Sequence, residues 1–298
     1  MNDKRNTRQH FERAAKTYDA AAVLQREVAT RLAARLDYIK LEPKSALDIG
    51  CGTGYITYDL LKRYPKSEIL ALDLSINMLQ QTLLGLGVKA SNKGWKNLFK
   101  TFKESHFTKS PLAICADAES LPLKPQSVDL IASNLMLQWS TDLAKTFAGF
   151  HEILAPNGLL LFTTFGPDTL KEMRESWAVV DKHPHTSNFT DMHEVGDALL
   201  QAGFINPVTD MEVITMTYKS VRQLMKDIKN IGASNTHSER NKGLMGKKKL
   251  AAFEQAYEQF KTAEGLYPAS WEIIYGHAWV GEGFKVDGFG KVIPIKSI

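Results

Sequence analysis

The sequence has few cysteines and no long apolar run, and both absences exclude broad classes of protein. Cys51 and Cys115 are the only two thiols among 298 residues, too few for a disulfide framework, so a reducing cytosol is the expected compartment. No stretch of about 18 apolar residues is present to span a membrane, and the opening residues lack the apolar segment of a secretory signal. No set of Cys and His residues has the spacing of a zinc site. We therefore expect a cytoplasmic protein that binds neither metal nor membrane.

Acidic and basic residues nearly balance, but the positive charge is concentrated in two segments. The formal net charge is +4. Residues 219–250 carry nine Lys or Arg against Asp227 and Glu239, and residues 85–110 carry six Lys against Glu104. The rest of the chain is therefore acidic. Two local basic surfaces, and not a generally basic protein, require an explanation.

Short apolar runs alternate with amphipathic helical patterns through the first two thirds of the chain. Apolar or alternating runs predict strands at 44–50, 67–75, 111–117, 127–134, 159–165, 207–218 and 270–280. Periodicity of 3.6 residues predicts helices at 11–18 and 22–36, and a third that ends at about residue 63. Further helices are predicted at 143–154, at 190–203 with Thr190 as its cap, and at 220–232. This alternation predicts an α/β fold, in which a parallel, Rossmann-like sheet has helices on both faces. Cys115, within the third strand, is expected in the core.

This pattern predicts that the chain is divided into four parts. We expect a helical cover over residues 1–38 and a core over residues 39–218 with an insertion at about 85–110. A basic helical lid is expected over residues 219–268, and the last core strand with a tail over residues 269–298.

A glycine-rich stretch, LDIGCGTG, links the first predicted strand to the helix after it. In an open parallel sheet, ligands bind at the carboxyl ends of the strands, and Gly50, Gly52 and Gly54 allow a ligand to approach the backbone closely. Asp48 precedes these glycines. Its negative charge argues against a phosphate and favours a ligand with an ammonium group.

Two further acidic residues follow the next two predicted strands. Asp73 ends the second strand, where its carboxylate can accept two hydrogen bonds from a ribose diol. Asp117 ends the third strand, where it can accept an adenine amino group. A strand-end aspartate that caps a turn is the ordinary alternative for each residue alone. Together with the glycines they favour a ligand that has an amine, a ribose and an adenine but no phosphate, and S-adenosylmethionine matches that description.

The segments LDIGCGTG, LDLS and ADAESLP resemble the class I methyltransferase motifs in their order and separation. The resemblance implies that the first loop holds the methionine end of S-adenosylmethionine, that Asp73 holds the ribose, and that Asp117 and Ala118 border the adenine. S-adenosylhomocysteine is the implied product. The cofactor-binding residues expected on these grounds are Asp48, Gly50, Cys51, Gly52, Gly54, Asp73, Leu74, Met78, Asp117, Ala118, Asn134 and Tyr18.

Segments outside those motifs resemble the malonyl-[acyl-carrier protein] O-methyltransferase family of biotin synthesis. They are HFERAAKTYDAAAVLQ, SNLMLQW, VVDKHPHTSNF, LMKDIKNIGASN and YPASWEIIYGHAW. The insertion at 85–110 is longer than is usual in that family, and the tail past Val280 has no counterpart there. The resemblance implies methyl transfer to the free carboxylate of a malonyl thioester, carried by an acidic acyl carrier protein or by coenzyme A. The methyl ester formed would prime pimeloyl and biotin synthesis.

A carboxylate acceptor makes modest chemical demands on the protein. It is already ionised at pH 7, so no general base is required, and we expect no catalytic acid or base. The acceptor oxygen must be aligned with the methyl group and shielded from water. Positive groups on the lid are the expected anion-binding residues, and Arg222, Lys226 and Lys229 lie at i, i+4 and i+7 of one predicted helix. A solvated helix face is the alternative for these three.

Three more residues are candidates for the acceptor pocket. Tyr18 is expected either to close over the cofactor and donate a hydrogen bond through its hydroxyl or to be a core aromatic residue. Gln138 and Trp139 follow the fourth predicted strand, at the edge of the sheet where the ligand binds. They are expected to wall the acceptor pocket, with simple packing as the alternative.

Two other functions remain open. Residues 89–109 interleave lysines with Trp95, Phe99 and Phe102, a pattern that also suits single-strand binding by an RNA methyltransferase. One amphipathic helix packed on the core explains the same pattern and is preferred, so nucleic acid is not the expected partner. The second alternative is a cofactor-binding assembly factor or arginine hydroxylase of the same lineage.

Overall fold

The computed structural model describes residues 4–87, 109–183, 185–186, 189–231 and 246–282. In this part of the chain, seven strands form one mixed sheet in the order β3-β2-β1-β4-β5-β7-β6. The strands are β1 (Ser45–Ile49), β2 (Glu68–Asp73), β3 (Leu112–Cys115), β4 (Val128–Ser133), β5 (Leu154–Phe165), β6 (Ile205–Tyr218) and β7 (Tyr267–Trp279). The α-helices are α1 (Lys4–Ala14), α2 (Tyr18–Ala21), α3 (Val23–Arg35), α4 (Tyr55–Arg63), α5 (Ile76–Gly85), α6 (Leu143–Ile153), α7 (Lys171–Ala178), α8 (Met192–Gln201), α9 (Val221–Asn230) and α10 (Lys247–Tyr257).

The strand order places a ligand-binding crevice at the middle of the sheet. Strands β3, β2, β1, β4 and β5 run parallel, and β7 is antiparallel to both β5 and β6. The chain builds outward from β1 to β3 in one direction and from β4 to β5 in the other, where β7 is later inserted between β5 and the edge strand β6, so the order reverses between β1 and β4. In such sheets the ligand binds outside the carboxyl ends of the strands at this reversal. The sequence pattern predicts a parallel sheet, and among the described strands the antiparallel β7 is the one that departs from this prediction.

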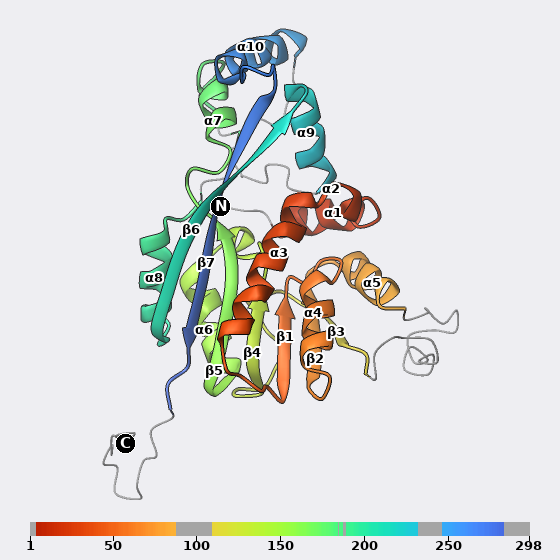
Figure 1. The fold of residues 1–298 in the computed structure, drawn as a ribbon, viewed down its shortest axis with the longest axis vertical. Coiled ribbons are helices and arrows are strands. Elements are labelled where there is room, and N and C mark those ends of the chain that lie inside the picture. The colour runs from red at the N-terminus through yellow and green to blue at the C-terminus, as the bar shows by residue number, and fades with distance from the viewer. Residues whose placement is uncertain (1–3, 88–108, 184, 187–188, 232–245, 283–298) are drawn as a thin grey trace, which may run out of the picture.

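Helices lie on both faces of the central strands (Figure 1), and the apolar residues of these strands alternate between the two layers. Ala46 of β1 belongs to the core beneath α3 and α4, whereas its neighbour Leu47 belongs to the core beneath α6 and α8. Both residues are fully buried. A strand that buries both faces has little room for polar side chains, so the functional groups come after the strands, at their carboxyl ends.

Three helices gather at one end of the molecule, beyond the carboxyl ends of the parallel strands (Figure 1). There β6 and β7 continue past the end of β5 as a two-stranded arm, with Tyr218 paired to Tyr267. Helices α7, α9 and α10 are attached to this arm. Trp177 of α7 stacks on Phe253 of α10, with ring centroids 4.2 Å apart, and the hydroxyl of Tyr257 donates to the carbonyl of Pro268 at 2.8 Å. The stacked rings join α7 to α10, and Val221 and Leu224 of α9 belong to the same buried core cluster.

Two local predictions are wrong, and two others lie outside the described residues. The third strand ends at Cys115, and that cysteine is exposed, because β3 is an edge strand and does not bury its last side chain. Helix α8 is capped by Asp191, which accepts from the amide of His193, and not by Thr190. The amphipathic helix expected at 89–109 and most of the tail past Val280 lie outside the described residues. Among the described helices, none combines the length and apolarity that a membrane crossing requires.

Candidate functional site

The glycine loop after β1 forms the floor of a pocket at the reversal point. Gly50 has φ of +72°, a left-handed conformation that favours glycine. A Cβ there would lie 2.5 Å from Cγ of Met136, so no larger residue fits. Gly52 donates its amide to Oδ2 of Asp73 at 2.9 Å and accepts from the Thr82 hydroxyl at 2.7 Å. The loop therefore offers bare backbone to a ligand.

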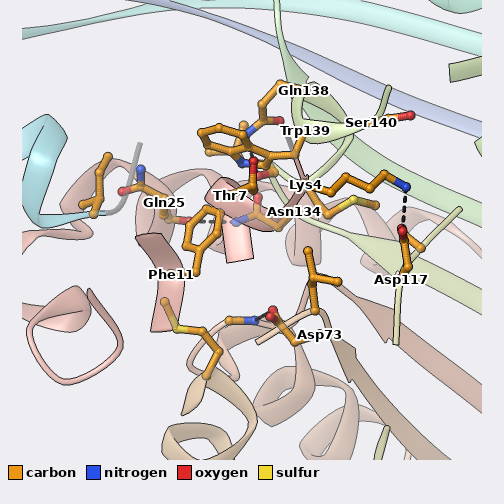
Figure 2. Close-up of a pocket in the computed structure, with 18 of the residues that line it drawn as sticks. Lys4, Thr7, Phe11, Gln25, Asp73, Asp117, Asn134, Gln138, Trp139 and Ser140 are labelled. Atoms are coloured by element: carbon orange, nitrogen blue, oxygen red, sulfur yellow. Dashed lines mark hydrogen bonds and ion pairs between the residues drawn. The ribbon is translucent and has the colours of Figure 1, made fainter. Parts of the chain in front are cut away.

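Asp73 lies at the end of β2 with its carboxylate in the pocket (Figure 2). Besides the Gly52 amide it accepts the Ser75 amide at 2.7 Å. Burial nevertheless raises the pKa of Asp73 to about 6, and the two amides offset only part of that effect. A ligand that donates hydrogen bonds, such as a ribose diol, would stabilise the ionised form. The accepting carboxylate of Asp73 and the bare floor of the loop therefore fit the cofactor expected from the sequence.

Asp48 has a different place from the one expected. Its carboxylate is buried and accepts the Thr57 hydroxyl of α4 at 2.6 Å. Burial raises its pKa to about 7, against the opposing effect of the Thr57 hydrogen bonds. Asp48 does not line the pocket, nor do Cys51 and Gly54. Its carboxylate lies beneath the loop, and its direct contact with the cofactor stays a prediction.

The end of the pocket at Asp117 is closed by a lysine that the sequence analysis did not identify. Lys4 of α1 contacts Asp117 at 2.6 Å and Glu119 at 2.7 Å. Oδ1 of Asp117 accepts the Glu119 amide at 3.0 Å. The bonds to Lys4 and to Thr141 lower the pKa of Glu119 to about 2, although burial opposes them. A lone lysine near the start of a chain carries no sequence signal for this role.

The N-terminal cover lies across the pocket. Phe11 of α1 packs edge-on against Trp139, with centroids 5.3 Å apart, and the side-chain amide of Asn77 in α5 donates to the Glu12 carbonyl at 3.0 Å. Tyr18 lines the pocket. Burial, and then the nearby Asp73, raise the pKa of Tyr18, so its hydroxyl stays protonated at neutral pH and can donate.

Asn134, at the end of β4, uses both its side-chain nitrogen and its side-chain oxygen in hydrogen bonds within the protein. Its Nδ2 donates to the carbonyl of Gln25 at 3.1 Å, and its Oδ1 accepts the Thr163 hydroxyl at 2.9 Å. Asn134 also lines the pocket. Gln138 likewise lines the pocket and donates to the Leu135 carbonyl at 2.6 Å.

The predicted lid cations do not reach the pocket. Lys226 and Lys229 on α9 are exposed and do not line it. Arg222 forms an ion pair with Glu254 of α10, with one contact at 3.1 Å. Among the described residues from 219 to 268, Ile231, just after α9, is the one that lines the pocket. The helix therefore presents an apolar end to the pocket and its basic face to solvent.

The pocket as a whole brings together nine of the twelve residues expected to bind the cofactor. It encloses about 930 Å³ of empty space, with the solvent at its open mouth included. The expected residues that line it are Tyr18, Gly50, Gly52, Asp73, Leu74, Met78, Asp117, Ala118 and Asn134, with Gln138 and Trp139 from the acceptor group. Phe165, which ends β5, also lines it. Lining residues that the sequence did not single out are Lys4, Thr7, Phe11, Gln25, Glu119, Leu135, Met136, Ser140 and Ile231.

Comparison with known proteins agrees with this geometry. The family described as a methyltransferase domain matches residues 47–162, from β1 into β5. The crystal structure of YcgJ from Bacillus subtilis is similar over 85% of this chain and 99% of that protein, with a TM-score of 0.57 at 15% identity. The sheet, the glycine loop and the pocket define a class I methyltransferase.

Curated relatives extend the similarity to almost the whole chain. A malonyl-[acyl-carrier protein] O-methyltransferase from Gallionella capsiferriformans is 46% identical over 277 residues, which cover 93% of this chain and 91% of the relative. Another from Xylella fastidiosa is 42% identical over 301 residues, covering 99% and 96% of the two chains. The chain belongs to the malonyl-[acyl-carrier protein] O-methyltransferase family.

Proposed function

We propose that the protein transfers the methyl group of S-adenosylmethionine to the free carboxylate of a malonyl thioester on an acyl carrier protein. The observation that carries this proposal is the extent of the family similarity. It covers 93% of the chain in the Gallionella relative, so it includes α7, α9 and α10 as well as the cofactor half. A likeness limited to residues 47–162 would have supported methyl transfer but not the acceptor.

The cofactor half has a group for each part of S-adenosylmethionine. The bare backbone at Gly50 suits the methionine end, the Asp73 carboxylate suits the ribose diol, and the segment at Asp117 and Ala118 suits the adenine. When bound, S-adenosylmethionine supplies the methyl carbon, which bonds to the acceptor oxygen as the carbon–sulfur bond breaks with its electron pair on sulfur. The acceptor carboxylate is already ionised, so no residue has to remove a proton. The chain's task is to align the acceptor and exclude water, which α1 and the Phe11–Trp139 contact support.

A methyl-transfer assay tests the proposal. Purified protein and labelled S-adenosylmethionine are mixed with malonyl-carrier protein, with acetyl-carrier protein and total RNA as parallel acceptors. Label on the malonyl species alone, released by mild base as an ester should be, is the expected result. Cofactor binding without label on any malonyl species would refute the acceptor, and label on RNA would favour the nucleic-acid alternative.

The exposed basic face of α9 suits the docking of an acidic carrier protein. Lys226 and Lys229 point to solvent, while Ile231, two residues beyond Lys229, lines the pocket. A carrier held at these lysines would lie beside the pocket mouth, where its malonyl arm can enter. Exposed charges of this kind mainly accelerate encounter and are sensitive to salt.

Charge reversal separates carrier docking from catalysis. The double substitution Lys226→Glu/Lys229→Glu is expected to raise KM for malonyl-carrier protein about tenfold at low salt, since each charge pair near a surface contributes roughly 0.2–1 kcal/mol and reversal adds repulsion. KM for malonyl-CoA should stay nearly unchanged. Lys40→Glu/Lys62→Glu is the matched control, because both lysines are exposed and lie toward the amino ends of the strands. Equal effects on the two thioesters, or on the two double variants, would contradict docking at α9.

A further inference from the structure

Helix α1 has two faces of different character. Lys4, Thr7 and Phe11 recur at the spacing of one helical face, and all three line the pocket. Arg13 lies about two and a half helical turns after Lys4, so it is on the opposite face. Arg13 is exposed, as is Lys16 just after the helix. One side of α1 therefore covers the pocket, and the other side presents positive charge to solvent.

The contacts that hold α1 on the pocket are weak ones. Its buried residues are Thr7 and Ala14, which are both small, so little apolar surface holds the helix in place. It is also attached by the ring contact of Phe11 with Trp139 and by the ion pairs of Lys4. The Lys4 side chain is 32% exposed, and ion pairs this accessible contribute little to stability. A helix held in this way opens at small cost, so a partner on its outer face can change the balance.

Helix α9 meets the N-terminal cover beside the pocket. Tyr18 of α2 and Ile231, just after α9, both line the pocket, and α2 is in contact with α9. Figure 1 shows α9 above α1 and α2. Lys226 and Lys229 of α9 are exposed. Positive charge on α1 and on α9 therefore borders the same pocket.

Basic residues predominate on the cover as they do on α9. Residues 4–19 carry five Lys or Arg against Glu12 and Asp19. Glu12 is paired with Arg8 at 2.9 Å, which leaves an excess of positive charge on the outer side of the cover. An acidic partner complements such a surface and is attracted to it over a distance. The family similarity favours a carrier protein over nucleic acid as that partner.

We propose that the acyl carrier protein docks across α1 and α9 together, and that its docking holds α1 closed over the cofactor. This inference rests on the proposed function. With α1 on the pocket, the carrier meets the basic faces of both helices, whereas with α1 displaced it meets α9 alone. The carrier therefore binds the closed form more tightly, and this difference in affinity shifts the cover toward closure. The cofactor also favours the closed form, because Lys4, Thr7 and Phe11 line its pocket, so each ligand strengthens the binding of the other.

Closure by the carrier suits the proposed reaction. Methyl transfer requires water to be excluded while the acceptor is present, and cofactor exchange requires the cover to open between turnovers. A malonyl group on coenzyme A reaches the pocket without a protein surface that could contact both helices. Comparison of the two thioesters therefore separates closure by docking from closure by a filled pocket.

The dissociation rate of S-adenosylhomocysteine tests the inference. Labelled S-adenosylhomocysteine is bound to the protein at low salt and chased with unlabelled compound, alone or with saturating malonyl-carrier protein, malonyl-CoA or total RNA. We expect the carrier to slow release about fivefold, the effect of two exposed charge pairs of ordinary strength. Malonyl-CoA and RNA should leave the rate within about twofold.

A double substitution on the outer face of α1 locates the effect. Arg13→Gln/Lys16→Gln should abolish the slowing by the carrier, and its affinity for S-adenosylhomocysteine without carrier should stay within about twofold of wild type, because neither residue lines the pocket. Lys40→Gln/Lys62→Gln is the matched control, since both lysines are exposed and lie toward the amino ends of the strands. The control should show the same slowing as wild type.

Several results would overturn the inference. These are an unchanged release rate in wild type although calorimetry shows the carrier bound, equal slowing in the α1 double variant and wild type, and equal slowing by malonyl-CoA and the carrier. Slowing by RNA and not by the carrier would also overturn it and would assign the basic surface to nucleic acid. Normal methylation of malonyl-carrier protein alongside any of these results would leave the proposed function standing. Protein that binds cofactor and carrier but methylates no malonyl species would refute the proposed function itself.

Discussion

Replacing Asp48 by Asn should stabilise the protein at alkaline pH. The carboxylate is fully buried beneath the glycine loop, and burial raises its pKa from 3.8 to about 7. The raised pKa means that the folded state disfavours the ionised form. The contribution of Asp48 to the free energy of unfolding is therefore fully present below pH 3.8 and is lost as pH rises through 7. The Asn variant does not ionise and escapes that loss.

The magnitude follows from the size of the shift. A shift of about 3 units at 1.36 kcal/mol each makes ionised Asp48 unfavourable by about 4 kcal/mol above pH 8. The amide of Asn keeps an oxygen for the Thr57 hydroxyl but adds an NH₂ group that costs about 1–3 kcal/mol if it finds no partner. We expect Asp48→Asn to exceed wild type by about 1–3 kcal/mol at pH 8.5. That advantage should shrink by about 2 kcal/mol at pH 5.5.

Guanidinium denaturation without cofactor, followed by tryptophan fluorescence from pH 5.5 to 8.5, measures the difference. Thr57→Val is a control in the opposite sense, because it removes the 2.6 Å hydrogen bond to the carboxylate and should increase the alkaline loss of stability. Thr57→Ser retains the hydroxyl and should resemble wild type. A stability difference between Asp48→Asn and wild type that does not grow with pH would refute the reasoning.

Three further predictions concern cofactor binding. Lys4→Met removes the ion pair that holds α1 on Asp117, so calorimetry should show S-adenosylhomocysteine bound a few-fold more weakly and with less dependence on salt; unchanged affinity would contradict a closing role. Gly50→Ala forces a Cβ to 2.5 Å from Met136, and at a φ of +72° the substitution should abolish detectable cofactor binding while circular dichroism still shows a folded protein. Asp73 has a pKa of about 6 in the free protein, so cofactor affinity should fall up to tenfold per pH unit below pH 6, because the ribose diol favours the ionised form; a flat profile from pH 7 to 5 would count against that contact.

The sequence predicted the residues whose positions follow from strand ends. Gly50 and Asp73 follow short apolar runs, and parallel strands bring such ends together whatever the rest of the fold does. The helical periodicity of residues 220–232 likewise located α9, which Ser220 caps. These features depend on local pattern and on one rule of sheet geometry.

Residues contributed by helices could not be placed in the same way. Gln25 belongs to α3, and its approach to the pocket depends on the bond from Asn134, more than a hundred residues away in the chain. Lys4 meets Asp117 only because α1 folds back over the sheet. The basic face of α9 pointed to a lid cation, but its direction relative to the pocket depends on how α7 and α10 pack. Tertiary packing, which leaves little periodic signal, determined each of these outcomes.

The arm formed by β6 and β7 has a consequence for how the acceptor end can move. Both strands are hydrogen-bonded continuously from the middle of the sheet to the base of α9, with Asp210 paired to Tyr275 and Tyr218 to Tyr267. A ribbon of this kind can bend elastically but has no flexible joint at which a rigid body could swing. Opening for a carrier-borne substrate is therefore expected to be graded and to strain the central sheet, so that amide hydrogens along the whole ribbon exchange as one cooperative unit.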